Sequence, residues 1–189
     1  MRAAEGVPQN AGDGRGKTQS VALSRKSHKG LGIMLSFDLA SYKFQLRAAA
    51  VILHDGWVLL HRAEGDDFWA LPGGRVEPGE DSASAVVREM HEELQETVVC
   101  RNLLYVVENF FSLKGKPNHE IGLYFAASLA SESCVLGKGQ SYFGVEGNSK
   151  LEFRWISQSE LHSLDLRPSC LKNSLSTPVL LFERIVQRE

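Results

Sequence analysis

Three glutamates in the middle of the chain are spaced so that they could bind a cation together. Glu89, Glu92 and Glu93 stand at positions i, i+3 and i+4, which share one face of an α-helix. Like charges this close destabilise a helix unless a positive group neutralises them. Hard divalent cations prefer carboxylate oxygens and accept water in their remaining positions. The spacing would therefore suit a hard divalent cation on this helix face.

The residues before the helix bear on whether this face is a metal site or an ordinary acidic surface. A Glu-x-x-Glu-Glu pattern alone is usually a solvated helix face. Here it follows Pro72-Gly73-Gly74, which breaks regular structure and lets backbone groups approach a ligand closely. A glycine carbonyl can also join the metal ligands. Because one helix joins this loop to the carboxylates, we favour the metal site.

Arg88 places a positive charge beside the glutamates. On a helix its guanidinium reaches Glu92 one turn further on, or Glu80 where the helix begins. Either contact orients a carboxylate without occupying the position of the metal. We therefore expect Arg88 and Glu80 to support the metal-binding side chains.

The elements around this segment must hold the loop and the helix in place. Phe44–His54 and Trp57–Arg62 are rich in β-forming residues, and the tight-turn dipeptide Asp55-Gly56 between them predicts a hairpin. A helix is expected to begin after a cap at Asp81 or Ser82 and to run to about residue 96. Its apolar face would consist of Ala83, Val86, Val87, Met90 and Leu94.

Strands and one helix are expected after the acidic helix. Val98–Ser112 and Ile121–Ser128 are typical of strands, with a hairpin loop at Leu113–Glu120. Residues 131–150 are polar and contain glycine, which predicts a long surface loop. The remaining predictions are a strand at Leu151–Ile156, a short helix from Ser157 or Ser159 to Leu164, and a closing amphipathic helix at Pro178–Gln187. This mixture indicates an α/β or α+β sandwich.

Composition indicates one folded domain. The chain has 189 residues, of which 43% are hydrophobic and 23% charged, enough apolar surface for a core. A formal net charge of −2 gives no electrostatic reason to expect nonspecific nucleic-acid binding. Three distant cysteines without Cys/His zinc spacing fit a reducing, cytoplasmic setting. Apolar runs such as Ala48–Leu53 are too short to span a membrane.

The first residues differ in character from the rest. Residues 1–30 contain six basic and two acidic side chains, so the other 159 residues carry a net charge of −6. Glycine and small polar residues recur here, and few large apolar residues are available for burial. We interpret residues 1–33 as a flexible basic tail, with a targeting or contact arm as the alternative. The folded domain is expected at residues 34–189.

The segment from Gly74 to Glu96 resembles the box of the Nudix hydrolase family, G-x5-E-x7-R-E-U-x-E-E-x-G-U, where U is bulky and apolar. Two end positions differ, because Gln95 replaces the glycine and Glu96 replaces the apolar residue. The glycine commonly ends the helix with a left-handed cap, so the difference concerns the helix end and not the metal face. The resemblance extends over about residues 40–189. The matching box positions are Gly74, Glu80, Arg88, Glu89, Met90, Glu92 and Glu93.

This resemblance implies a fold, a reaction and a set of roles. The fold would be a Nudix-type α/β/α sandwich, a mixed β-sheet with the box helix over it. The reaction would be divalent-metal-dependent hydrolysis, with Mg²⁺ or Mn²⁺, of a pyrophosphate linkage in a small nucleoside diphosphate derivative. Many family members are homodimers, and the sequence does not decide this. By resemblance Glu92 and Glu93 are the principal ligands, Glu89 a ligand or the base, Gly74 a carbonyl ligand, and Glu80 and Arg88 supporting residues.

Four further residues are weaker candidates. Glu120, in the expected loop before a strand, is the leading candidate outside the box for a base or an extra ligand; a surface carboxylate is the alternative. Arg62 ends the second strand and could meet phosphate, or lie free on the surface. Phe68 and Trp69 precede the glycine loop and could stack on a base. We expect one of these two aromatic residues to serve core or rim packing instead.

The residues downstream of the box bear on the substrate. The proline typical of ADP-ribose enzymes and the tyrosine typical of diadenosine polyphosphate enzymes are both missing around Phe110–Leu113. Nucleotide sugars, ADP-ribose-like compounds and nucleoside triphosphates remain. A non-catalytic nucleotide-binding module is the first alternative, and the intact carboxylates argue against it. An RNA 5′-end pyrophosphohydrolase is the second, and the acidic folded part argues against nucleic acid.

Overall fold

The computed structural model describes residues 34–39, 41–137, 140–177 and 182–189. The expected tail at residues 1–33 lies outside the described residues. Within the described part, nine strands form one mixed sheet. The strands are β1 (Ser36–Leu39), β2 (Tyr42–His54), β3 (Trp57–Ala63), β4 (Gly73–Arg75), β5 (Val98–Leu113), β6 (Lys116–Leu129), β7 (Ser141–Glu146), β8 (Ser149–Ser157) and β9 (Glu183–Arg188).

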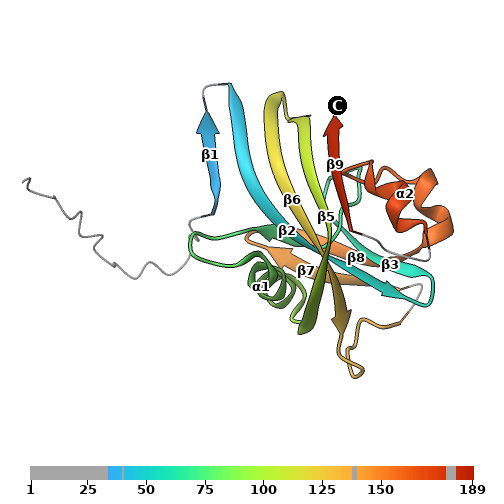
Figure 1. Cartoon of the computed structure of the whole chain (residues 1–189). Helices are drawn as coiled ribbons and strands as arrows, with labels where there is room; N and C mark the ends of the chain where they lie inside the picture. Colours follow the sequence, from blue (N-terminus) through green and yellow to red (C-terminus); the bar gives the residue numbers. More distant parts are fainter. Residues whose placement is uncertain (1–33, 40, 138–139, 178–181) are drawn as a thin grey trace, which may run out of the picture. The chain divides into compact units, whose positions relative to one another are not determined.

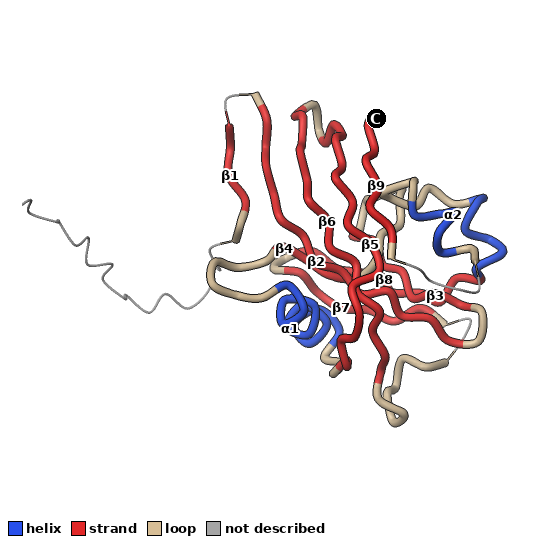
Figure 2. The backbone as a smooth tube through the Cα atoms, viewed as in Figure 1, coloured by secondary structure: helices blue, strands red, loops and turns tan. Residues whose placement is uncertain are grey.

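The sheet places helices on both of its faces. Its strand order is β7-β8-β3-β2-β6-β5-β9, and β1 and β4 both pair with β2. β2 lies parallel to β6 and β5 parallel to β9, whereas the other pairs are antiparallel. Helix α1 (Ser82–Leu94) lies on one side, and the 3₁₀-helix η1 (Gln158–Ser163) and α2 (Leu171–Leu175) on the other (Figures 1 and 2). This arrangement confirms the predicted sandwich with a mixed sheet.

Strand β2 has two differently used faces because successive side chains point to opposite sides. The even-numbered Ala48, Ala50 and Ile52 belong to the buried cluster that includes residues of α1. The odd-numbered Ala49 and Val51 belong to the cluster that includes residues of η1 and α2. Small alanines let elements approach the sheet closely on both sides. Toward the start of β2 the odd-numbered face becomes polar, and it is this face that lines a pocket.

Helix α1 begins and ends close to the predicted positions. The Asp81 side chain caps it and accepts hydrogen bonds from the backbone N–H groups of Ala83 and Ser84 at 3.1 and 3.0 Å. At its other end Gln95 adopts the left-handed conformation, with φ of 58°. Its side-chain amide donates to the carbonyl of His91 at 2.8 Å. Gln95 thus takes the conformation usual for glycine, and the divergent box still ends its helix there.

Two predictions about the later elements are wrong. Instead of a helix, Glu183–Arg188 form β9, and residues 178–181 lie outside the described residues. Ile185 and Gln187 face inward alternately, and β9 completes its backbone hydrogen bonds along β5. The expected loop at residues 131–150 contains β7, which pairs with β8. Glycine and polar residues obscure the alternation of β7 in the sequence.

The β5–β6 connection is also shorter than expected. Only Lys114 and Gly115 separate the two strands, and both have positive φ, 51° and 77°. Pro117 lies near the start of β6, where a missing N–H is tolerated. Glu120 therefore lies inside a strand, whereas the sequence predicted that it would lie in a loop. It is buried, with 5% of its surface exposed.

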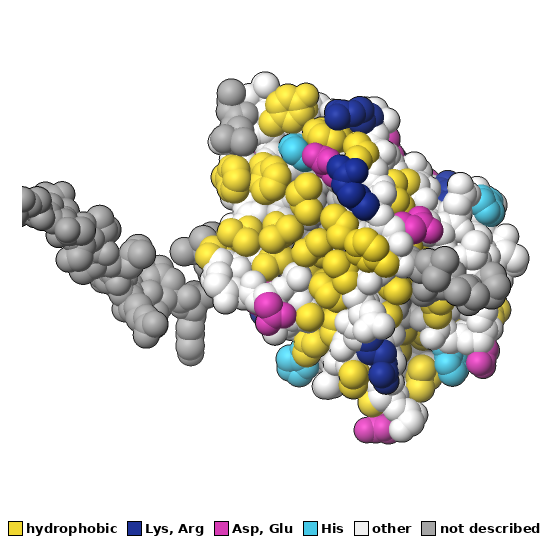
Figure 3. Space-filling model, viewed as in Figure 1, with side chains coloured by type: hydrophobic (Ala, Val, Ile, Leu, Met, Phe, Trp, Pro, Cys, Tyr) yellow, Lys and Arg dark blue, Asp and Glu magenta, His cyan; other side chains and the backbone are white. Residues whose placement is uncertain are grey.

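Beyond α1, its side of the sheet carries an aromatic row. Phe37 stacks on Phe44 at 5.0 Å between ring centroids, and Phe110 stacks on His119 at 4.3 Å. Arg188 lies over the Phe110 ring at 4.0 Å. Figure 3 shows hydrophobic side chains gathered over one face of the molecule. In the part of the chain that the structure describes, no helix has the length and apolarity needed to cross a membrane.

Candidate metal and substrate site

Arg88 connects the beginning of α1 to its acidic face. Its Nε and Nη2 donate to the two carboxylate oxygens of Glu80 at 2.8 and 3.0 Å. Its Nη1 donates to Glu89 at 2.9 Å and to Glu92 at 3.1 Å, and Nη2 also donates to the Arg75 carbonyl at 3.1 Å. The hydrogen bond from Arg88 lowers the pKa of Glu80. Both contacts expected for Arg88 are therefore present.

The glycine loop is pressed against the helix. Gly74 pairs with Ala48 of β2, and a Cβ at residue 74 would lie 2.2 Å from Oε1 of Glu89. Gly73 has a φ of 141°, and a Cβ there would lie 2.3 Å from the Ala48 carbonyl. Only glycine fits at either position without displacing its neighbours. The absence of side chains lets the loop backbone contact the Glu89 carboxylate directly.

Glu93 is the most unusual acidic side chain of the helix. It is 3% exposed, and neither of its carboxylate oxygens has a hydrogen-bond partner. His61 of β3 lies opposite, with Nδ1 3.6 Å from Oε2 of Glu93 and also without a hydrogen-bond partner. Burying a carboxylate without partners is strongly unfavourable, and a bound cation would remove that cost. The two buried carboxylate oxygens of Glu93, which lack hydrogen-bond partners, are therefore suitable ligands for a hard divalent cation.

Burial also changes how these groups titrate. Burial raises the pKa of Glu93 to about 8, with Arg47 opposing the shift and Glu146 adding to it. Burial likewise raises the pKa of Glu89 to about 6, against the hydrogen bond from the neighbouring guanidinium. The pKa of His61 falls to about 3 because the imidazolium would be buried. His61 is therefore neutral at physiological pH and can offer a lone pair.

Strand β7 brings a further carboxylate to this place. Gly144 lies against the end of α1, since a Cβ there would lie 1.9 Å from the Glu93 carbonyl oxygen. Glu146, two residues along the same strand, shares the side of Gly144. Its charge contributes to the raised pKa of Glu93. The segment that the sequence predicted as a surface loop thus closes the acidic face of α1.

The acidic face does not present a complete set of metal ligands in this conformation. Among the described residues, no three His, Cys, Asp or Glu side chains converge closely enough to hold an ion. The side chain of Glu92 is 59% exposed and pairs with Arg88. Glu89 and Glu93, in contrast, are buried on the inner side of the helix. The structure therefore buries two of the three predicted ligands, and Glu92 stays exposed while it shares the Arg88 guanidinium with Glu89.

A cationic pocket of about 540 Å³ adjoins this face. Arg47 and His61 line it, and the charge of Arg47 also acts on Glu93. Seven Lys and Arg side chains and four Asp and Glu side chains line the pocket, a surplus of three positive charges. The acidic folded part of the chain thus has a positive cavity next to its buried glutamates. Such a cavity suits a phosphorylated ligand.

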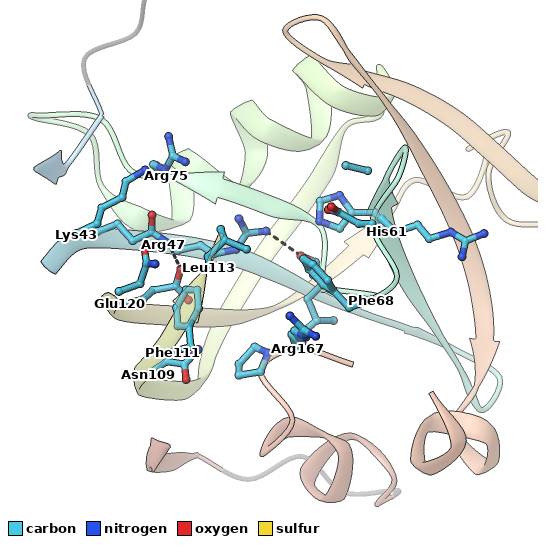
Figure 4. Close-up of a pocket in the computed structure, with 18 of the residues that line it drawn as sticks. Lys43, Arg47, His61, Phe68, Arg75, Asn109, Phe111, Leu113, Glu120 and Arg167 are labelled. Carbon is cyan, nitrogen blue, oxygen red and sulfur yellow. Dashed lines mark hydrogen bonds between the residues drawn. The ribbon is translucent and has the colours of Figure 1, made fainter. Parts of the chain in front are cut away.

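Of the aromatic and arginine candidates, two line the pocket, and Figure 4 labels one of them, Phe68. Arg62 is one, but it bonds Glu152 at 2.7 Å and lies over the Trp69 ring at 4.6 Å. Phe68 is the other, and Arg167 covers its ring at 4.5 Å. Trp69 is 5% exposed and belongs to the core, so it is the aromatic residue of the pair that serves packing.

Glu120 faces the same pocket from β6. It accepts a short hydrogen bond from the Gln45 side chain of β2, drawn as a dashed line in Figure 4. The sequence singled out Glu120 but overlooked Gln45, Arg47 and His61. A signal for the β2 residues was available, because Lys43, Gln45 and Arg47 alternate with apolar residues along a predicted strand. No local pattern marks His61.

Comparison with known proteins gives the family of this chain. The family model for the NUDIX domain matches residues 43–173, more than half of the sequence. A putative ADP-ribose pyrophosphatase of Bacillus subtilis is 31% identical over 98 residues, which are 51% of this chain and 44% of that protein. The CTP pyrophosphohydrolase of Escherichia coli is 46% identical over 50 residues, 24% of this chain and 37% of that protein. The chain thus spans less than half the length of these curated relatives.

Solved structures agree on the fold. A NUDIX hydrolase from Nitrosomonas europaea superimposes with a TM-score of 0.54 at 18% sequence identity, over 77% of this chain and 79% of the other. At this identity the likeness concerns the fold alone. Together with the family match across the box and the flanking strands, it identifies the chain as a member of the NUDIX family.

Proposed function

We propose that this chain hydrolyses a pyrophosphate linkage in a small nucleoside diphosphate derivative, with a divalent cation at the acidic face of α1. The observation that carries the proposal is Glu93, a buried carboxylate without a hydrogen-bond partner on either oxygen. It lies one helical turn after Glu89, which packs against the glycine loop, and 3.6 Å from His61, which lines the cationic pocket. A structural glutamate would be paired or exposed, so this arrangement favours a cation ligand.

A small set of residues would bind the cation. We assign Glu89, Glu92 and Glu93, with the carbonyl of Gly74, as ligands of Mg²⁺ or Mn²⁺. Such a cation neutralises the diphosphate and lowers the pKa of a bound water. The pKa of Glu89, about 6, also suits a group that takes a proton from water near neutral pH.

Two residues would act through the ligands. Arg88 bonds Glu80 through both carboxylate oxygens and so fixes its guanidinium at the start of α1. From there it holds Glu89 in place under the loop. For Glu92 to become a ligand, its bond to Arg88 must open, and the exposure of Glu92 leaves room for this.

The positive pocket supports a phosphorylated substrate. Arg47, Arg75 and Lys43 line it on the side of β2 and β4, where negative phosphates would be held. Nucleotide sugars, ADP-ribose-like compounds and nucleoside triphosphates all carry the required diphosphate. The names of the two curated relatives refer to ADP-ribose and CTP, which supports both of the latter groups.

A substrate panel tests the proposal. ADP-ribose, UDP-glucose, CTP, ATP, diadenosine tetraphosphate and 5′-triphosphate RNA are offered with Mg²⁺, with Mn²⁺ and with EDTA. We expect metal-dependent turnover of at least one small nucleotide, and a loss of about 10²–10⁴-fold in Glu93→Gln. Glu160→Gln, an exposed glutamate on η1, is the matched control and should retain full activity. Absence of turnover with every compound, or cleavage of RNA alone, would refute the proposal.

A further inference from the structure

Four polar side chains cross four neighbouring strands in one row. Gln45 of β2 is paired with Glu120 of β6, Glu120 with Asn109 of β5, and Asn109 with Gln187 of β9. Residues paired across strands point to the same face of a sheet. Gln45, Glu120 and Asn109 all line the cationic pocket. We call these three residues the polar row.

The polar row offers more hydrogen-bond acceptors than the protein uses. The side-chain Oδ1 of Asn109 is buried and has no hydrogen-bond partner. Glu120 has one donor, the side chain of Gln45, although a carboxylate can accept about four hydrogen bonds. Gln187, the next residue in register, is already satisfied, since it accepts from the Cys170 N–H at 2.7 Å and donates to Glu189. The unused acceptors therefore lie in the pocket and call for a ligand with N–H or O–H groups.

The polar row lies on the same face of β2 as the residue that connects the pocket to the acidic helix. The charge of Arg47 acts on Glu93, and Arg47 lines the pocket together with Gln45. Gln45 lies two residues earlier on β2 and points to the same face, about 7 Å away along the strand. A diphosphate bound beside Arg47 would therefore place its nucleoside over the polar row.

An apolar ring lies beside these acceptors. Phe111 follows Asn109 by two residues on β5 and lines the same pocket. Figure 4 shows Asn109, Phe111 and Glu120 on one side of the pocket, with Phe68 and Arg167 across from them. A flat heteroaromatic ring can stack on such side chains while its edge reaches the acceptors.

We propose that Glu120 and Asn109 recognise a nucleobase with an exocyclic amino group, as in cytosine or adenine. The amino group would donate to the Glu120 carboxylate and the Asn109 oxygen, which leaves neither acceptor unpaired. Uracil and hypoxanthine carry a carbonyl oxygen at the equivalent position, so two acceptors would face each other. This inference rests on the proposed function, because it assigns the nucleoside end of the same substrate.

The experiment compares bases that differ only in this group. We expect kcat/KM for CTP over UTP, and for ATP over ITP, to favour the amino base by about 10–100-fold in the wild type. Both ratios should fall to about 3-fold or less in Glu120→Gln and in Asn109→Leu. Glu183→Gln changes an exposed glutamate outside the pocket and should keep the wild-type ratios.

Binding separates this inference from the proposed activity. Calorimetry with CMP, UMP, AMP and IMP reports base recognition without any hydrolysis, and melting temperatures show that the variants are folded. Equal affinities for amino and oxo bases would overturn the inference even if the enzyme is active. A preference that persists in both variants would also overturn it. The inference would also be wrong if selectivity depended on the sugar of UDP-glucose and not on the base.

Discussion

Oε2 of Glu93 lies 3.6 Å from Nδ1 of His61, and neither atom has a hydrogen-bond partner. The two residues come from α1 and β3, and both are almost fully buried. Because the imidazole is neutral, the contact is not a charged ion pair. Two electron-rich groups that face each other without a proton donor are stabilised by a proton or by a cation between them. Glu93 should therefore either carry a proton or contact a cation in the folded protein.

The first prediction concerns pH and the stability of the metal-free protein. The pKa of Glu93 rises on folding from its ordinary value of 4.5 to about 8, so the folded state binds more protons between these values. Its contribution to stability is complete below pH 4.5 and is lost as the pH rises toward 8. In EDTA we therefore expect the melting temperature to fall from pH 5.5 to 8.5.

Two variants isolate the glutamate responsible. Glu93→Gln cannot ionise and should lose most of this pH dependence, whereas Glu160→Gln should retain it. Added Mn²⁺ should stabilise the wild type more at pH 8 than at pH 6, because the cation competes with the proton. A melting temperature that rises with pH in EDTA would show that Glu93 is not a buried neutral acid.

The second prediction concerns the contact between the glycine loop and the helix. Gly74→Ala would place a methyl group 2.2 Å from Oε1 of Glu89, so the loop or the carboxylate must move. We expect turnover to fall by about 10²-fold or more, because misplaced ligands misorient the reacting groups. Steady-state kinetics measures the loss of turnover, and circular dichroism shows separately whether the variant keeps its fold.

A double variant separates the steric cause from a general loss of structure. Glu89→Asp shortens the carboxylate and should relieve the clash in Gly74→Ala/Glu89→Asp. The melting temperature of the double variant should exceed that of Gly74→Ala, while its turnover stays low. Full activity of Gly74→Ala would contradict the close packing of loop and helix.

The third prediction concerns the end of α1. Gln95 holds a left-handed conformation that costs a residue with a Cβ about 1 kcal/mol relative to glycine. We expect Gln95→Gly to raise the free energy of unfolding by about 0.5–1 kcal/mol, with urea denaturation as the measurement. Gln95→Ala keeps the backbone conformation but loses the bond to the His91 carbonyl, and should be less stable than the wild type. If glycine destabilises the protein as much as alanine, the side-chain bond and not the backbone governs this helix end.

The local part of the site could be predicted from the sequence. A helix has a fixed period, so the shared face of Glu89, Glu92 and Glu93 and the reach of Arg88 to Glu80 follow from spacing alone. The Asp55-Gly56 turn predicts the β2–β3 hairpin in the same way. These features need no knowledge of which elements meet in space.

The non-local part could not be predicted. The burial of Glu93 depends on β3 and β7 packing against α1, and nothing near Glu93 in the sequence marks His61 or Glu146. The alignment of Gln45, Glu120 and Asn109 depends on the register of three strands. The strand β9 was mistaken for a helix because a short apolar pattern fits both periods until its partner strand is known.

Titration with Mn²⁺ tests most directly whether the acidic face of α1 binds a divalent cation. Free Mn²⁺ is measured by electron paramagnetic resonance at pH 8 for the wild type, Glu93→Gln and Glu160→Gln. We predict saturable binding to the wild type and to Glu160→Gln, with affinity reduced by about 10–100-fold in Glu93→Gln. Equal Mn²⁺ affinity of Glu93→Gln and the wild type would contradict the placement of the cation at Glu93.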